Sequence, residues 1–230
     1  PLFPYARQDK KSAAREPISA RLLADMLQAA GADRLLTVDL HAGQIVGFFG
    51  VPVDHVTALP LFARYYRRRR LRGDAVVVVS PDLGRVKAAR RFARMLDAGF
   101  AIVTKERPTH ELAVAAEVIG DVRGKHAVVG DDMIVSGGTL AAAAAALVQP
   151  GARDVRAFAT HALFTAGAAE TLGESALAEI VVTDTVALSG SPIPAGTRIV
   201  SVAGLLADTI QAVFQNSSVS ALFAGENELF

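Results

Sequence analysis

Residues 127–148 read AVVGDDMIVSGGTLAAAAAALV, and this stretch decides the fold. Its opening run, residues 127–129, is short, apolar and bounded by polar residues, which favours a buried parallel strand over a helix. The adjacent carboxylates Asp131 and Asp132 follow, and after them come the small turn residues 136–139 and a run of strong helix formers. The order of these parts predicts a strand, an acidic pair, a tight turn and a helix.

The turn and the acidic pair together predict a site for a phosphorylated sugar. Because residues 136–139 carry no bulky side chain, their backbone N–H groups approach a phosphate closely, and the following helix adds the positive end of its dipole. The carboxylates of Asp131 and Asp132 accept hydrogen bonds from vicinal sugar hydroxyls and help to hold a divalent cation. The alternative is an ordinary strand-to-helix turn, in which Ser136 or Thr139 caps the helix and the aspartates are merely exposed.

Five segments resemble known sequence signatures. Residues 131–139 resemble the loop that binds 5-phosphoribosyl 1-diphosphate (PRPP) in type I phosphoribosyltransferases and in ribose-phosphate diphosphokinases, or PRPP synthetases. Four others resemble signatures of the second family, in its order: PYARQDKKSAAREPISARLLADML at 4–27, VDLHAGQIVGFF at 38–49, VVSPDLG at 78–84 and SVSALF at 218–223. The similarity extends over nearly all 230 residues. It implies transfer of the diphosphoryl group of Mg-ATP to O1 of ribose 5-phosphate, which yields PRPP and AMP, with Mg²⁺ as the cofactor.

Apolar strands and helices alternate from residue 74 onward, which predicts an α/β protein with a parallel sheet covered on both faces. Helices are expected at 18–30, 44–49, 59–70, 85–96, 139–148, 166–172 and 203–214. Strands are expected at 35–40, 51–56, 75–80, 101–104, 127–129, 155–160, 180–183 and 199–202. Candidate site residues then fall at the carboxyl ends of strands, where such sheets bind ligands.

The resemblance implies two type I phosphoribosyltransferase-like, doubly wound parallel-sheet domains. We place the boundary near Val56, so that residues 1–56 form the C-terminal part of the N-terminal domain and residues 57–230 form the C-terminal domain with the PRPP loop. The chain begins at Pro1, inside a family signature that normally follows a strand-rich segment. The first domain is therefore expected to be incomplete.

Composition excludes several other classes of protein. With 24 basic and 23 acidic residues the net charge is +1, so the chain has no global field typical of nucleic-acid or membrane-surface proteins. The longest strongly apolar stretch, residues 140–148, is far shorter than the roughly 20 residues of a membrane span. No cysteine is present, which excludes disulfides and thiolate chemistry. A cytoplasmic protein that binds neither nucleic acid nor membrane is expected, and the resemblance implies a homo-oligomer.

Lys105 and Arg107 are the candidate catalytic residues. Phosphoryl transfer requires cations that stabilise charge on the moving group, and two residues spaced in this way on an extended segment project to the same face. They open a polar stretch, residues 105–111, that is able to close over substrates and exclude water. By resemblance this stretch is the catalytic flexible loop; the alternative is a solvated loop with exposed charges.

The remaining site residues follow from the resemblance. Asp131 and Asp132 would bind the ribose hydroxyls, and the 5-phosphate would be bound by Val135, Ser136, Gly137, Gly138 and Thr139. His41 and Asp82 are the metal positions, although imidazole is not a favoured Mg²⁺ ligand and a water-bridged contact fits equally well. Nucleotide contacts are assigned to Arg7, Gln8 and His41. The basic cluster at 67–70 and 72 is interpreted as a solvated helix end, with phosphate-dependent regulation as the alternative.

The chain departs from the family pattern at four places. After SPD the chain continues with Leu83, Gly84 and Arg85 where the pattern has only small residues, so a bulky cation enters a region near the nucleotide and the metal. Val135 replaces an acidic or hydroxyl residue, Ser136 replaces Thr, and Glu111 replaces Asn. These changes keep open a second hypothesis, a catalytically impaired regulatory paralogue that binds ribose 5-phosphate or nucleotide. A base phosphoribosyltransferase is the third, but it gives no reason for the YARQD and DLHA segments.

Overall fold

The computed structural model describes residues 1–11, 13–105, 116–188 and 192–223. The chain forms two compact units: Pro1–Ala58 together with Val202–Phe230, and Leu59–Ser201. The first break lies close to the boundary proposed at Val56. Residues 202–230, which the sequence placed with the second domain, group with the first unit, because the chain leaves the second unit after its last strand and no sequence signal marks that change.

Seven strands of the second unit form one sheet in the order β5-β4-β3-β6-β7-β8-β9. Their bounds are β3 Val76–Ser80, β4 Gly99–Lys105, β5 Ala116–Ile119, β6 His126–Ile134, β7 Asp154–Ala162, β8 Leu177–Thr183 and β9 Thr197–Val200. Neighbouring strands are parallel, except that β5 is antiparallel to β4. The α/β class with a mostly parallel sheet is thus confirmed, and the antiparallel edge strand β5 is an element that the sequence did not predict.

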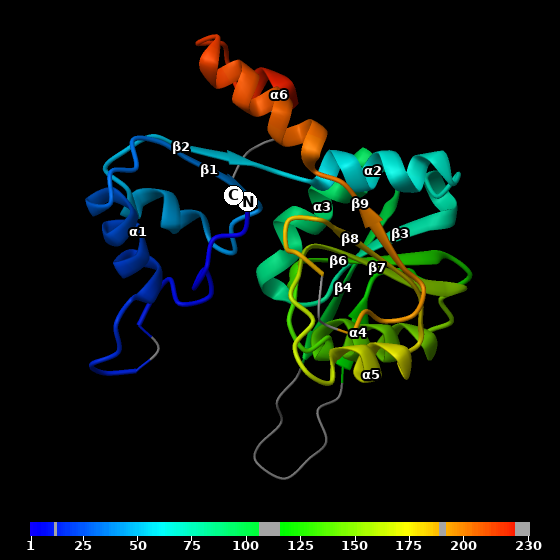
Figure 1. Cartoon of the computed structure of the whole chain (residues 1–230). Coiled ribbons are helices and arrows are strands. Elements are labelled where there is room, and N and C mark those ends of the chain that lie inside the picture. The colour runs from blue at the N-terminus through cyan, green and yellow to red at the C-terminus, as the bar shows by residue number, and fades with distance from the viewer. Residues whose placement is uncertain (12, 106–115, 189–191, 224–230) are drawn as a thin grey trace. The chain divides into compact units, whose positions relative to one another are not determined.

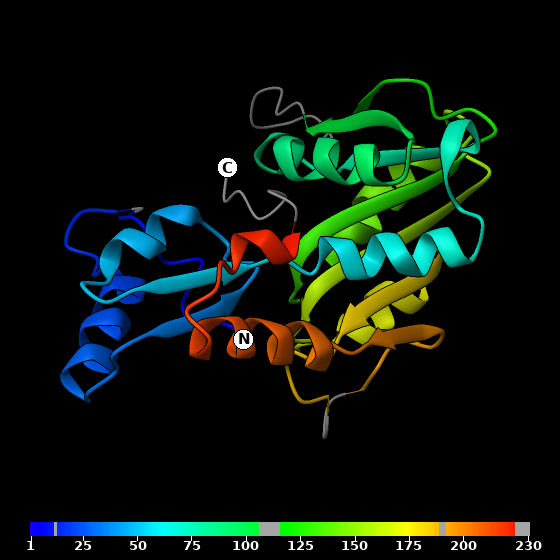
Figure 2. The same ribbon diagram turned by 90° about the horizontal axis from the view of Figure 1, so that it is seen from above.

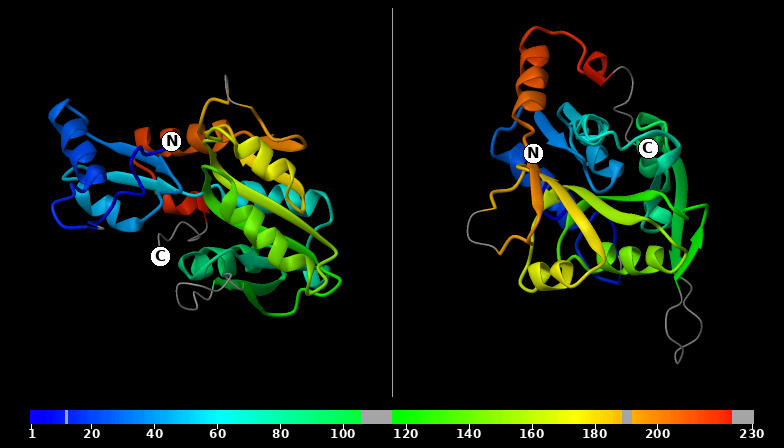
Figure 3. Two further views of the ribbon diagram at one scale, coloured as in Figure 1. Left: turned by 90° about the horizontal axis from the view of Figure 1, so that it is seen from below. Right: turned by 90° about the vertical axis from the view of Figure 1, so that its right-hand side faces the viewer.

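Helices cover both faces of this sheet (Figures 1 and 3). α2 (Leu59–Arg68) and α3 (Val86–Met95) lie on one face, and α4 (Gly138–Val148) and α5 (Ala168–Gly173) lie on the other. α3 connects β3 to β4, whereas α4 connects β6 to β7, so the chain winds outward in opposite directions from the adjacent strands β3 and β6. Open α/β sheets bind ligands at such a switch point, outside the carboxyl ends of the strands.

An aromatic cluster fills the space between the sheet and the helices α2 and α3. The ring of Phe158 in β7 lies 4.6 Å from that of Phe62 and 4.4 Å from that of Phe92, measured between centroids. The hydroxyl of Tyr66, which is fully buried, donates a hydrogen bond to the Ala157 carbonyl at 3.3 Å. Phe158 also lies against the backbone of β6, where a Cβ at Gly130 would come within 2.3 Å of Phe158 Cζ. This residue of β6 must therefore lack a side chain.

The first unit contains a small parallel sheet of β1 (Leu35–Val38) and β2 (Val53–Val56). Two α-helices, α1 (Ser19–Ala29) and α6 (Ala203–Phe214), accompany it (Figure 2). The helix expected at 44–49 is a short 3-10 helix, η1 (Gly43–Phe48), whose Ile45 packs in a core with Phe3, Ala6, Ala20 and Leu40. A second 3-10 helix, η4 (Ser220–Phe223), follows α6. None of the helices within the described ranges is long and apolar enough to cross a bilayer.

Candidate active site

The acidic pair lies inside β6 rather than after it. The sequence ended this strand at Val129, but β6 continues to Ile134 because β7 pairs with it as far as Ile134 and Ala162. Pairing with the other neighbour, β3, ends at Val79 opposite Val129. Asp131 and Asp132 therefore project past the end of β3 while β7 still holds their backbone, which places them at the carboxyl edge of the sheet as expected.

Arg85 binds both carboxylates of the acidic pair. Its Nε lies 3.3 Å from Asp131 Oδ1, and its Nη2 contacts Asp132 Oδ1. The side chains are mostly covered, with 19% of Arg85, 16% of Asp131 and 4% of Asp132 exposed. The same carboxylate oxygens accept backbone hydrogen bonds, Asp131 Oδ1 from the Asp132 amide at 2.8 Å and Asp132 Oδ1 from the Met133 amide at 2.9 Å. The sequence identified Arg85 as a bulky cation near the site but did not predict this contact.

Burial and charge act against each other at this pair. Desolvation by burial, followed by the charge of Asp132 and a hydrogen bond with it, raises the pKa of Asp131 to about 7, although Arg85 lowers it. For Arg85, burial opposes the charged form, but Asp132 and Asp131 outweigh it and raise the pKa of the guanidinium. The cation is thus retained in the site by the two acids.

Asp82 caps the turn that carries Arg85. Its Oδ1 accepts hydrogen bonds from the Gly84 amide at 2.8 Å and the Arg85 amide at 3.1 Å, at the start of the 3-10 helix η3 (Leu83–Arg85). Ser80, the last residue of β3, donates its hydroxyl to the Asp82 carbonyl at 2.6 Å. The proposed metal ligand therefore has a structural task that the sequence did not predict, and it directs Arg85 toward β6.

The turn between β6 and α4 is fixed from behind. Gly137 has φ of 80°, and a Cβ there would lie 2.5 Å from Leu172 Cγ, so both its conformation and its packing require glycine. The Val135 carbonyl accepts hydrogen bonds from the amide and the hydroxyl of Thr165, at 3.0 and 3.1 Å. α4 begins at Gly138, and the first amides of a helix have no carbonyl partner within it. The predicted strand, tight turn and helix are thus present, and the N-terminus of α4 directly follows the turn.

The two predicted catalytic residues are Lys105 and Arg107. Lys105 is the last residue of β4, and its backbone pairs with Ala116 of β5. β4 runs parallel to β3, with Ile102 opposite Ser80, so Lys105 falls at the same edge of the sheet as the turn after β3. Arg107 lies outside the described residues, as does Glu111.

The predicted nucleotide contacts Arg7 and Gln8 are exposed residues of the first unit. They follow Tyr5, whose positive φ of 58° turns the chain, and the Gln8 amide donates to the Tyr5 carbonyl at 2.8 Å. This turn presents both side chains to solvent.

His41 follows a strained turn at the carboxyl end of β1. Asp39 has φ of 42°, and its Oδ2 accepts a hydrogen bond from the Ala58 amide at 2.9 Å. The Leu40 amide donates to His55 Nε2 at 2.9 Å, which further holds this turn. His41 belongs to the first unit and Asp82 to the second, so their joint metal site stays a prediction. Within the described ranges, no group of three or more His, Cys, Asp or Glu residues is arranged to hold a metal ion.

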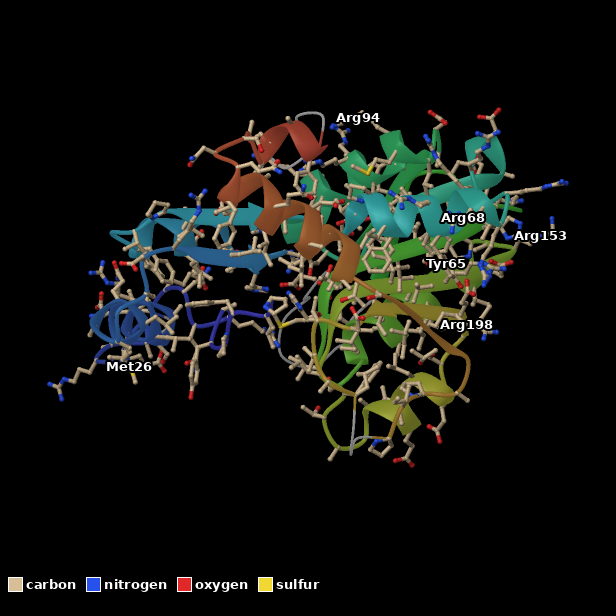
Figure 4. All side chains as sticks on the ribbon, turned by 45° about the horizontal axis from the view of Figure 1, so that its top comes forward. Met26, Tyr65, Arg68, Arg94, Arg153 and Arg198 are labelled. Carbon is tan, nitrogen blue, oxygen red and sulfur yellow. The ribbon has the colours of Figure 1, made fainter. Side chains whose placement is uncertain are left out.

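The arginine cluster at the end of α2 has several partners of its own. The Arg69 guanidinium stacks over the Tyr65 ring at 4.2 Å and lies 3.7 Å from Glu179 Oε1. Arg67 Nη2 lies 3.4 Å from Asp97 Oδ2. Figure 4 shows Tyr65 and Arg68 on the same side of the second unit. The expectation that this cluster binds no nucleic acid stays a prediction.

Comparison with known proteins places the chain in a family. Family models for the N-terminal domain of ribose phosphate pyrophosphokinase and for the phosphoribosyl synthetase-associated domain match residues 1–31 and 101–224. A ribose-phosphate pyrophosphokinase of Fusobacterium nucleatum is 47% identical over 223 residues, which is 97% of this chain and 71% of the relative. The chain belongs to the ribose-phosphate pyrophosphokinase family. The resemblance stated from the sequence is thereby confirmed.

Other members of the ribose-phosphate pyrophosphokinase family give the same result. The protein from Corynebacterium efficiens is 48% identical over 230 residues, which is 98% of this chain and 70% of that protein. The crystal structure of phosphoribosylpyrophosphate synthetase from Mycobacterium smegmatis matches with a TM-score of 0.85 and 44% identity, over 94% of this chain and 70% of that chain. The family's fold is therefore the fold of this chain, and the chain spans about 70% of the length of these relatives.

Proposed function

We propose that this chain synthesises PRPP by transferring the diphosphoryl group of Mg-ATP to O1 of ribose 5-phosphate. O1 attacks the β-phosphorus, the bond from that phosphorus to the oxygen bridging to the α-phosphate breaks, AMP leaves and O1 loses its proton. The chain belongs to this family, and one observation supports the proposal most directly. Asp131 and Asp132 lie beside the Gly137 turn and the N-terminus of α4, at the switch point of the sheet.

The two ends of the sugar phosphate would be bound by different chemical groups. Carboxylates accept hydrogen bonds from vicinal hydroxyls, so Asp131 and Asp132 would orient the ribose ring. The loop from Val135 to Thr139 would bind the 5-phosphate through backbone amides and the helix dipole. The contacts of Gly137 with Leu172 and of Val135 with Thr165 support this role, because they fix the loop before the ligand arrives.

Lys105 and Arg107 would stabilise the charge on the transferring diphosphoryl group. Phosphoryl transfer depends mainly on positioning and on such electrostatic stabilisation. The position of Lys105 at the end of β4, at the same sheet edge as the turn after β3, supports this role.

Asp82, with His41, would hold the Mg²⁺ of the nucleotide. Mg²⁺ usually binds one or two carboxylates together with substrate phosphates and waters, so the exposed carboxylate of Asp82 fits, and an imidazole fits better through water. When bound, the ion neutralises phosphate charge on the nucleotide. Arg7 and Gln8 would contact the nucleotide. A homo-oligomer and a cytoplasmic location stay predictions.

A catalytically impaired regulatory protein is the second candidate, and the ion pairs of Arg85 with both ribose-binding carboxylates favour it. An assay of AMP release from Mg-ATP, with and without ribose 5-phosphate, separates the two on the complete gene product. Release of AMP and PRPP in equal amounts, only with the sugar present, supports the synthetase. Binding of ribose 5-phosphate without release supports the regulator, and neither binding nor release contradicts both. Consumption of PRPP with a free base would instead indicate a phosphoribosyltransferase.

A further inference from the structure

Arg85 is placed so that one guanidinium serves two carboxylates on consecutive residues of a strand. Successive side chains of a strand normally point to opposite faces of the sheet. Asp131 and Asp132 nevertheless both reach Arg85, and each also accepts the amide of the following residue. A guanidinium carries five N–H donors in a rigid fork, which allows it to bind two acids at once.

The position of Arg85 is enforced by its own turn. Asp82 holds the Arg85 amide, Ser80 holds the Asp82 carbonyl, and α3 begins at the residue after Arg85. A Cβ at Gly84 would lie 3.2 Å from Asp82 Oδ1, so this turn is tight. Since β3 and β6 are neighbours in the sheet, the turn after β3 directs Arg85 to the acids of β6.

The charge of the acidic pair is therefore partly compensated within the chain, because one guanidinium faces two carboxylates. Ion pairs that are covered from solvent are screened much less than exposed ones, and loss of one partner leaves an uncompensated charge. Two facing carboxylates without a guanidinium attract a divalent cation, whereas a cation fixed between them repels one. Sugar hydroxyls are neutral donors, so they do not require the pair to carry its full negative charge.

We propose that Arg85 is a positioning residue, the built-in counter-cation of Asp131 and Asp132, and that it lets this chain bind the pentose of its phosphosugar without a divalent cation at the acidic pair. This inference rests on the proposed function, because it assumes that the pair binds the sugar. Arg85 acts through the two acids: it holds their carboxylates in one arrangement before the hydroxyls bind.

The test measures binding rather than turnover, on the full chain and the variants Arg85→Ala, Arg85→Lys and Arg94→Ala. Arg94 is an exposed arginine of α3 outside the site, and it provides the matched control (Figure 4). Calorimetry gives the affinity for ribose 5-phosphate with excess EDTA and with Mg²⁺. Electron paramagnetic resonance gives the number of Mn²⁺ ions bound in the absence of sugar, and circular dichroism verifies folding.

The wild type and Arg94→Ala should bind ribose 5-phosphate with affinities that agree within about twofold in EDTA and in Mg²⁺. The affinity of Arg85→Ala for ribose 5-phosphate should fall by about tenfold or more in EDTA, and Mg²⁺ should restore most of it. This variant should also bind one more Mn²⁺ ion than the wild type. Arg85→Lys keeps the charge but not the fork, so it should fall between the two.

The proposal would be overturned if the wild type bound the sugar only with Mg²⁺. It would also be overturned if Arg85→Ala bound ribose 5-phosphate in EDTA with the affinity of the wild type. If Arg85→Ala does not fold, the comparison of the wild type in EDTA and Mg²⁺, together with Arg85→Lys, decides the question. If the wild type binds no ribose 5-phosphate under either condition, the proposed function fails. The Mn²⁺ count still tests Arg85 in that case, because an extra ion in its absence supports the counter-cation role and an unchanged count contradicts it.

Discussion

Gly137→Ala should destabilise the second unit more than any conservative change at the neighbouring loop positions. A residue other than glycine in the left-handed region costs about 1–2 kcal/mol, and the φ of Gly137 is 80°. Its new Cβ would lie 2.5 Å from Leu172 Cγ and below 3 Å from both methyl carbons, and such overpacking costs about 1–3 kcal/mol. The expected loss in the free energy of unfolding is therefore about 2–5 kcal/mol.

The adjacent glycine provides a matched control for this measurement. Gly138 has no positive φ, and a Cβ there would meet only Ser136 Oγ at 3.7 Å, which is ordinary contact. Since Gly138 is the first residue of α4, Gly138→Ala should leave stability unchanged or raise it by up to about 1 kcal/mol. Urea unfolding followed by circular dichroism measures both variants.

A double-mutant cycle separates the steric part from the conformational part. Leu172→Ala alone should cost about 2–5 kcal/mol, because Leu172 is 2% exposed and packs in the core. In the double variant the new methyl group of residue 137 fills part of the vacated space, so the two losses should be less than additive by about 1–3 kcal/mol. Equal stability of Gly137→Ala and Gly138→Ala, or strict additivity with Leu172→Ala, would refute the reasoning.

Three further predictions concern other parts of the structure. Gly130→Ala should lower the free energy of unfolding by about 1–3 kcal/mol, because its Cβ would lie 2.3 Å from Phe158 Cζ. When Phe158→Leu is added to Gly130→Ala, part of this loss should be recovered, and urea unfolding measures both changes. The pKa of Asp131 is about 7 in the folded chain, above the value of about 3.9 in an unfolded one, so between these values the native state holds a proton that the unfolded state releases. Its contribution to stability therefore falls as pH rises through this range, and Asp131→Asn should remove about 2 kcal/mol of the decline between about pH 5 and pH 8; an unchanged slope would contradict the assignment. Lys105→Ala should reduce AMP release by about 100-fold or more, while calorimetry still detects binding of ribose 5-phosphate. Lys87 is an exposed lysine of α3, and Lys87→Ala should leave AMP release unchanged. Wild-type turnover in Lys105→Ala would show that Lys105 takes no part in the catalytic step.

Local sequence patterns predicted the parts of the fold that local forces determine. The apolar run at 127–129 became part of β6, and the small residues before α4 became a turn in which Gly137 needs its positive φ. The α/β class followed from the alternation of apolar strands and helices. The family followed from signature segments distributed along the chain, and the comparisons confirmed it.

The features that the sequence did not predict depend on partners distant in the chain. β6 continues past Gly130 because β7 pairs with it, and β5 exists because Ala116–Ile119 meets β4. The local sequence of β6 or β5 does not indicate which strand will pair with it. Arg85 was recognised as unusual, but its contact with Asp131 and Asp132 arises only when β3 and β6 become neighbours.

The glycine beneath the acidic pair limits how this chain can be recombined with its relatives. Gly130 leaves room for the ring of Phe158, which in turn packs against Phe62 of α2 and Phe92 of α3. A chimera that takes its acid-bearing strand from a homologue with a side chain at this position must also take a smaller residue in place of Phe158. Otherwise the graft forces the sheet and both helices apart, directly next to Asp131 and Asp132.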